Sequence, residues 1–160
     1  MFPKAHAAAY VMMAYRIAYC KINYPLAYYA AYFGIRADAF SYALMCQGKE
    51  TLNYHIKQYK SKGDQLSRGF EFVPIDIYRA KAKMFQIVDG KLMPSLASIE
   101  GMGDKAAEAV EEAAKDGAYL SLDDFRQRTK VSKTVIDLMA ELGLFGDLPQ
   151  SNQLSLFDFT

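Results

Sequence analysis

The stretch that decides the fold is Ser98-Ile99-Glu100-Gly101-Met102-Gly103-Asp104-Lys105-Ala106-Ala107, in which two glycines join an apolar segment to an alanine-rich one. The glycines allow a tight turn whose backbone amides point outward. The alanines predict a helix that runs to about Lys115, and a helix begins with unpaired amides and a partial positive charge. A turn of this kind is a cradle for an anion, and we expect the anion to be a DNA backbone phosphate. The candidate DNA-binding residues of this turn are Gly101, Met102, Gly103 and Lys105.

A second turn of similar design follows. Residues 121–124, Ser-Leu-Asp-Asp, are typical of a capping box that opens a short helix through Arg128. A turn without glycines comes next, and the residues from Lys133 to Leu142 predict a second helix that ends at Gly143. Basic side chains bring positive charge to this edge, including Arg126 and Arg128. The candidate DNA-binding residues of the second turn are Lys130, Val131, Ser132 and Lys133.

The first glycine pair also has a structural interpretation. Gly101 and Gly103 are compatible with a simple helix–helix connection in an α-helical interaction module. The following helix is acidic, and acidic side chains repel phosphate; these residues are Asp104, Glu108, Glu111, Glu112 and Asp116. Unchanged DNA affinity after the substitution Gly101→Val would favour this alternative.

Upstream of the turns the chain is predicted to be helical with one small β element. Apolar residues three or four apart predict a helix over 4–23 with Ala7, Val11, Ala14, Ala18 and Ile22 on one face. Pro25 suits the start of a second helix, from Leu26 to Phe33, with Gly34 as its stop. A weaker helical pattern covers 41–62.

The β element is predicted around an Asp-Gly pair. Residues 84–88 and 91–93 flank Asp89-Gly90, which favours a hairpin with a type I′ turn. Residues 70–78 contain β-formers, but Pro74 limits them to an edge strand at best.

The chain ends on a short apolar peptide. Residues 149–152, Pro-Gln-Ser-Asn, predict an exposed linker. Beyond it, a glutamine amide and two apolar anchors suit docking in the groove of another protein. A fold-back of this peptide onto the domain's own core is the alternative. The candidate docking residues are Gln153, Leu154, Ser155, Leu156 and Phe157.

Composition limits the class of protein. The 160 residues suffice for one domain or two small ones, and the formal net charge of +1 requires any DNA contact to be local. Cys20 and Cys46 are far apart and lack neighbouring ligands, so we expect a reducing cytoplasm and no metal site. Arg16 and Lys21 interrupt the apolar N-terminal stretch, so we expect no membrane span.

These motifs resemble known ones. The Gly-Met-Gly turn resembles the helix-hairpin-helix motif, and two copies resemble the paired domain of polymerases and repair enzymes. Residues 2–10, Phe-Pro-Lys-Ala-His-Ala-Ala-Ala-Tyr, resemble the Phe-x-Lys-x-His-x-x-Ala-Tyr element in the fingers of bacterial DNA polymerase III alpha subunits, with Pro3 in place of an expected asparagine. The similarity to the PolC type covers the terminal peptide and residues 11–19, 24–33, 73–79, 89–90, 101–103 and 130–134. The terminal peptide resembles the motif that binds the sliding clamp.

The resemblance implies roles for these segments. Lys4, His6 and Tyr10 are expected beside the incoming nucleotide, and residues 153–157 on the clamp. The implied partners are double-stranded DNA held by its backbone, the sliding clamp and the rest of the polymerase. Magnesium is implied for the complete enzyme, but no cofactor for this chain alone. No palm-like pair of carboxylates is recognisable, so no catalytic residue is assigned and the chain alone is expected to be inactive.

The expected fold class is mainly α. We expect a helical fingers fragment over 1–69, a small β connection over 70–93, a tandem helix-hairpin-helix domain over 94–148 and a flexible clamp-binding tail over 149–160. The alternative function is a free-standing, non-enzymatic adaptor that binds DNA and the clamp. Coding sequence for palm and fingers directly upstream would favour the polymerase, and a promoter there would favour the adaptor.

Overall fold

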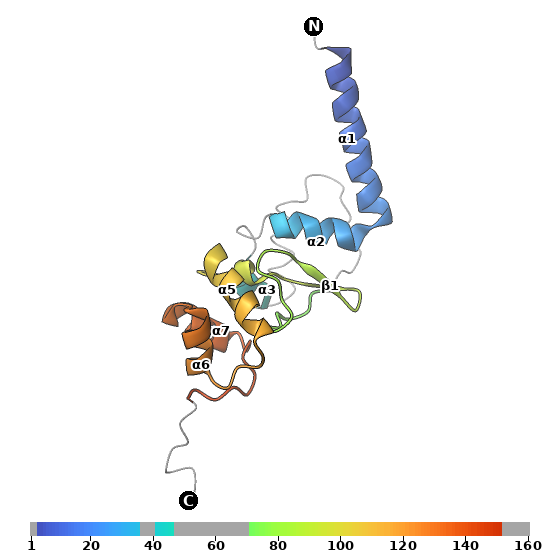
Figure 1. Ribbon diagram of the computed structural model, residues 1–160. Coiled ribbons are helices and arrows are strands. Elements are labelled where there is room, and N and C mark those ends of the chain that lie inside the picture. Colours follow the sequence, from blue (N-terminus) through green and yellow to red (C-terminus); the bar gives the residue numbers. More distant parts are fainter. Residues whose placement is uncertain (1–2, 36–40, 47–70, 152–160) are drawn as a thin grey trace, which may run out of the picture.

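The computed structural model describes residues 3–35, 41–46 and 71–151 (Figure 1). As the sequence predicts, the described part is mainly helical and contains a small β-hairpin. Its elements in chain order are α1 (Lys4–Asn23), α2 (Pro25–Ile35), α3 (Tyr42–Cys46), β1 (Gln86–Val88), β2 (Lys91–Met93), the 3₁₀ turn η2 (Leu96–Ser98), α5 (Asp104–Lys115), α6 (Leu122–Thr129) and α7 (Lys133–Glu141).

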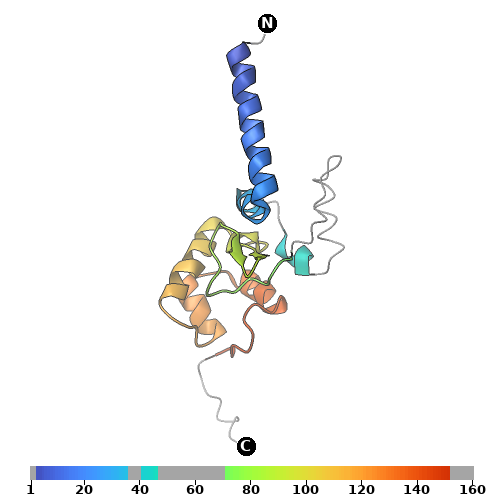
Figure 2. The ribbon, with the colours of Figure 1, turned by 90° about the vertical axis from the view of Figure 1, so that its right-hand side faces the viewer.

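Helix α1 projects from the rest of the described structure (Figures 1 and 2). None of its residues is buried. The predicted apolar face is therefore exposed, as are large side chains such as Tyr15 and Val11. The interruption at Pro25 is confirmed, because α1 ends at Asn23 and α2 begins at Pro25. Within the described residues, α1 packs mainly against α2.

Helix α2 is longer than predicted. We expected Gly34 to end it, but the helix continues to Ile35. Gly34 has a packing role instead, because a Cβ atom at this position would lie 3.4 Å from the backbone oxygen of Lys83. The helix can therefore approach the segment before β1, and Phe33 contacts Phe85 with ring centroids 5.6 Å apart.

The β-hairpin forms as predicted. Strands β1 and β2 pair antiparallel with Ile87 opposite Leu92. Asp89 (φ 51°) and Gly90 (φ 74°) both have positive φ, as a type I′ turn requires. The edge strand expected over 70–78 is reduced in the described residues to a single parallel bridge between Phe72 and Leu92.

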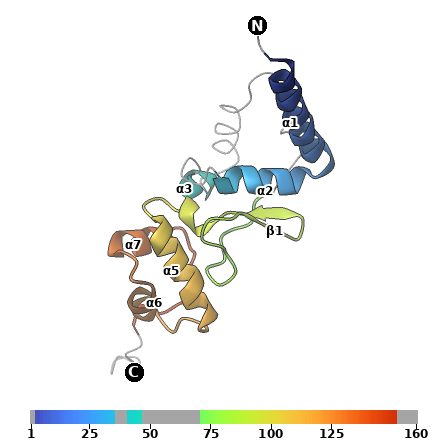
Figure 3. The same ribbon diagram turned by 45° about the horizontal axis from the view of Figure 1, so that its top comes forward.

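The C-terminal helices share one core. The fully buried Phe125 of α6 lies 4.8 Å from the ring of Tyr119 and 4.9 Å from that of Phe145. Figure 3 shows α5, α6 and α7 gathered at the end of the molecule away from α1. The buried side chains of this core come mainly from 75–82, 93–113 and 119–145. The first helix that the helix-hairpin-helix resemblance implies before the Gly-Met-Gly turn is reduced to η2, a single 3₁₀ turn.

The segment after α7 returns to the start of α6. Gly143 (φ 71°) ends α7 as predicted, and the Leu144 amide donates to the Met139 oxygen at 3.0 Å. The carbonyl oxygens of Pro149 and Gln150 then accept from the amides of Leu122 (2.9 Å) and Asp123 (3.2 Å). The side chains of 149–151 are exposed, as expected of a linker, but the backbone is attached to α6.

Across the three described ranges, every helix is too short or too polar to cross a bilayer.

Candidate nucleic-acid interface

The two glycines of the first turn have different structural roles. Gly101 has φ +78°, a conformation that favours glycine, and a Cβ atom there would lie 3.3 Å from Cγ2 of Val135. Gly103 has an ordinary φ of −71° and is the N-cap of α5. A Cβ atom on Gly103 would meet no described atom within 4 Å. The positive φ of Gly101 therefore forms the turn, whereas the absence of a side chain on Gly103 leaves open space beside the start of α5.

The space in front of Gly103 is lined by unpaired donors. The first amides of an α-helix have no partner within the helix. In the described part of the chain, nothing accepts a hydrogen bond from the amides of Gly103, Asp104 and Lys105, and no side chain caps α5. The first intrahelical contact is that of Ala107, whose amide donates to the Gly103 oxygen at 3.0 Å. These open amides at the positive end of α5 suit an anion.

The second turn repeats this geometry without glycine. Lys130 takes the left-handed conformation with φ 56°, and Ser132 is the N-cap of α7 with φ −64° and ψ 149°. The amides of Val135 and Ile136 both donate to the Ser132 oxygen at 3.1 Å. Among the described residues, no acceptor pairs with the amides of Ser132, Lys133 and Thr134, and the Ser132 side chain makes no cap.

The two turns match residue by residue. Gly101 corresponds to Lys130 (positive φ), and Gly103 corresponds to Ser132 (extended N-cap). Between them lie Met102 and Val131, which are both buried. The two turns are therefore two copies of one motif.

Met102 and Val131 need a correction. We expected both to contact DNA, but their side chains belong to the hydrophobic core. Their amides are also occupied: that of Met102 donates to the Ile99 oxygen at 3.0 Å, and that of Val131 to Thr129 Oγ1 at 3.4 Å. Met102 and Val131 occupy the same position in the two copies and are both apolar. This match indicates that their side chains anchor the turns in the core.

The basic side chains divide into two groups. Lys105, Lys130 and Lys133 are exposed, and among the described residues no carboxylate lies within salt-bridge distance of them. Lys105 lies next to the first turn, and Lys130 and Lys133 belong to the second turn. These three lysines are available to an anionic ligand.

Arg128 is not available, contrary to the expectation that it adds charge to the edge. Its guanidinium lies 4.6 Å from the ring centroid of Tyr119 and 3.5 Å from Asp124 Oδ2. It donates to the carbonyl oxygens of Gly117 (3.3 Å), Ala118 (3.4 Å) and Ala113. Arg128 thus caps the C-terminal end of α5 and joins it to α6, so that its role is structural. Burial beside it raises the pKa of Tyr119 to about 12.

The capping box before Arg128 forms in part. Ser121 Oγ accepts from the Asp124 amide at 3.1 Å, as predicted. The Asp124 carboxylate, however, accepts from the amide of Leu120 (3.0 Å), one residue earlier than the standard box. With the carbonyls of Pro149 and Gln150, these contacts satisfy the N-terminal amides of α6, which therefore offers no anion site.

The acidity of α5 is offset by lysines that the sequence did not suggest. Lys83 Nζ lies 2.9 Å from Asp104 Oδ2 and 3.1 Å from Glu108 Oε1. Lys81 Nζ lies 3.0 Å from Glu111 Oε1. The Ala82 amide donates to Glu111 and is the main cause that lowers the pKa of this carboxyl. The repulsion expected between α5 and a phosphate is thereby reduced.

The other candidates lie elsewhere. Lys4, His6 and Tyr10 are all exposed on α1, and the rings of His6 and Tyr10 lie 4.5 Å apart. Helix α1, which carries them, lies at the opposite end of the molecule from α6 and α7 (Figure 1). Residues 153–157 lie outside the described residues. The described residues contain no group of three or more His, Cys, Asp or Glu side chains placed to hold a metal ion.

Two open helix starts, each behind a tight turn with a buried apolar residue, define a tandem helix-hairpin-helix domain. The family model of the helix-hairpin-helix motif matches residues 69–154, which is more than half of the chain, and the chain belongs to this family.

Curated relatives of the chain are PolC-type DNA polymerases III. It is 45% identical over 98% of its length to the PolC-type DNA polymerase III of Caldanaerobacter subterraneus subsp. tengcongensis. The corresponding enzymes of Bacillus cereus and Thermotoga maritima are 42% and 41% identical, also over 98% of this chain. The resemblance to the C-terminal part of a PolC-type alpha subunit is thereby confirmed. The chain spans only 12% or 13% of the length of these three relatives.

Proposed function

We propose that this chain is part of a replicative DNA-directed DNA polymerase of the PolC type and that its tandem hairpins hold double-stranded DNA by the backbone. The observation that carries the proposal is the repeated turn, with three open amides at the start of α5 and three at the start of α7. Membership of the helix-hairpin-helix family and similarity to PolC-type polymerases support it.

The proposed contact is chemically simple. A phosphate oxygen accepts hydrogen bonds from the open amides of residues 103–105, and another accepts from those of residues 132–134. The partial positive charge of each helix start adds to these bonds. Lys105, Lys130 and Lys133 contribute charge and release counterions. Backbone contacts of this kind position a duplex but do not read its sequence.

The N-terminal helix serves the nucleotide side in this proposal. Lys4 and His6 lie in the first turn of α1, where a cation, a ring nitrogen and open helix amides suit a triphosphate. Tyr10 follows one turn later and offers a ring that stacks on a base. The described residues do not fit a two-magnesium centre, so no chemical step is assigned to them, and we propose that the chain alone is inactive.

The C-terminal peptide is the proposed tether to the sliding clamp. Tethering raises the effective concentration of a weak DNA-binding domain on its substrate. A weak contact at residues 153–157 and a weak contact at the hairpins then give processive binding together. Replication of this kind takes place in the cytoplasm of a bacterium.

The proposal is tested by duplex binding over a range of salt. We expect the full chain to bind two duplexes of unrelated sequence with equal affinity. Contact with about three phosphates would give a logarithmic salt slope of about −3. Fluorescence anisotropy of labelled duplexes measures both quantities. An affinity independent of salt, or a strong preference for one sequence, would contradict the proposal.

A further inference from the structure

The position of Asp104 raises a question about the first hairpin. Asp104 is the first residue of α5 and directly follows the N-cap Gly103. A carboxylate at a helix start is attracted by the same amides that are proposed to bind phosphate. Asp104 is therefore placed to compete with DNA for the site. Yet no side chain caps α5 in the structure.

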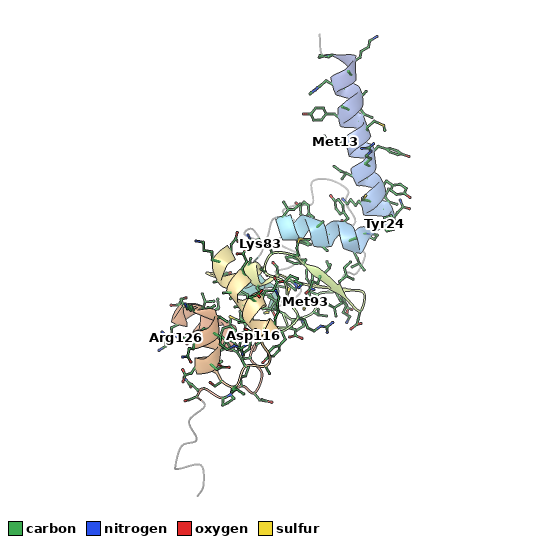
Figure 4. All side chains as sticks on the ribbon, viewed as in Figure 1. Met13, Tyr24, Lys83, Met93, Asp116 and Arg126 are labelled. Carbon is green, nitrogen blue, oxygen red and sulfur yellow. The ribbon has the colours of Figure 1, made fainter. Side chains whose placement is uncertain are left out.

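A lysine from another segment holds this carboxylate. Lys83 Nζ lies 2.9 Å from Asp104 Oδ2 and 3.1 Å from Glu108 Oε1, so one ammonium group bridges two carboxylates one helical turn apart. Figure 4 shows Lys83 between α2 and α5. The side chains of all three residues remain roughly half exposed. The bridge draws Asp104 aside and offsets its charge.

The backbone around Lys83 is well fixed. The Ala82 amide donates to Glu111 Oε2 of α5 at 2.7 Å, and the Ala82 oxygen accepts from the Ala97 amide at 2.9 Å. The Lys81 oxygen accepts from the Leu96 amide at 3.0 Å. The segment that carries Lys83 is thus attached both to α5 and to the 3₁₀ turn η2, which leads into the first hairpin. The fold therefore places the Lys83 ammonium group beside α5.

We propose that Lys83 is a positioning residue for DNA binding. It holds Asp104 and Glu108 away from the phosphate site, so that the open amides of the first hairpin stay accessible to DNA. This inference rests on the proposed function. Lys83 acts through the two carboxylates and does not itself contact DNA. Without it, Asp104 caps α5, and two uncompensated negative charges face the phosphate.

The test is a cycle of variants in the full chain. Lys83→Met is expected to weaken duplex binding about fivefold at low salt. In the background of Asp104→Asn with Glu108→Gln, the same substitution is expected to change affinity by less than about 1.5-fold, because the competing charges are absent. Lys91→Met is the matched control, because Lys91 of the β-hairpin is about as exposed as Lys83 and pairs with Glu71.

The outcomes separate the hypotheses. Equal weakening by Lys83→Met in both backgrounds would show a direct contact with DNA and overturn the positioning role. No weakening in the wild-type background, or the same weakening by Lys91→Met, would also overturn it. If the wild-type chain fails to bind duplex at all, the proposed function itself falls, and the inference falls with it. Circular dichroism melting of each variant shows whether the fold is retained.

Discussion

Replacing Gly103 by valine is expected to weaken duplex binding about tenfold, because the branched side chain fills the space in front of three open amides. The cost to the fold should be small. The φ of −71° suits any residue, and no described atom lies within 4 Å of the added Cβ. We expect the loss of a favourable N-cap glycine to lower stability by at most about 1 kcal/mol.

Anisotropy at several salt concentrations and thermal melting measure the two effects of Gly103→Val. The salt slope should also fall in magnitude by about 1, since one phosphate contact is lost. Gln127→Val is the control, because Gln127 is exposed on α6 and lies in neither turn. Undiminished affinity in the Gly103 variant would exclude the first turn as the phosphate site.

Replacing Leu156 and Phe157 together by alanine should reduce binding to a purified sliding clamp about a hundredfold or more. Two buried apolar anchors carry most of the energy in a short docking peptide. Surface-bound clamp and soluble variants of the full chain give the affinity directly. Duplex binding in the absence of clamp should not change, because the hairpins lie elsewhere in the chain.

The tail offers its own control for this experiment. Phe159 lies two residues beyond the docking peptide, so that Phe159→Ala removes a similar apolar surface from outside the motif. This variant should bind the clamp as the wild type does. Retained binding by the double variant, or a comparable loss in the Phe159 variant, would refute the assignment of residues 153–157.

Local features were predictable from the sequence because their causes are local. Asp89-Gly90 specifies a turn with two positive φ angles, and Pro25 specifies a helix start. Ser121 caps α6 through the amide three residues on. The two copies of the turn were also recognisable, although the second has Lys130 where the first has Gly101. A lysine accepts the left-handed conformation at a modest cost in energy.

The remaining features depend on residues far apart in the chain. Gly34 looks like a helix stop, and only the nearby backbone of Lys83 shows that it is a packing residue. Arg128 looks like a DNA-binding charge, but its donors meet the carbonyls at the end of α5. The pair of Lys83 and Asp104 joins residues 21 positions apart, and no local pattern predicts it. Tertiary packing decides each of these roles.

In the proposed complex, open amides at two equivalent helix starts hold the DNA backbone. An NMR titration of the ¹⁵N-labelled chain with duplex DNA tests this contact most directly. We expect the largest amide shifts at residues 103–105 and at residues 132–134, with both sets saturating together. Shifts confined to other parts of the chain, with these six amides unaffected, would contradict it.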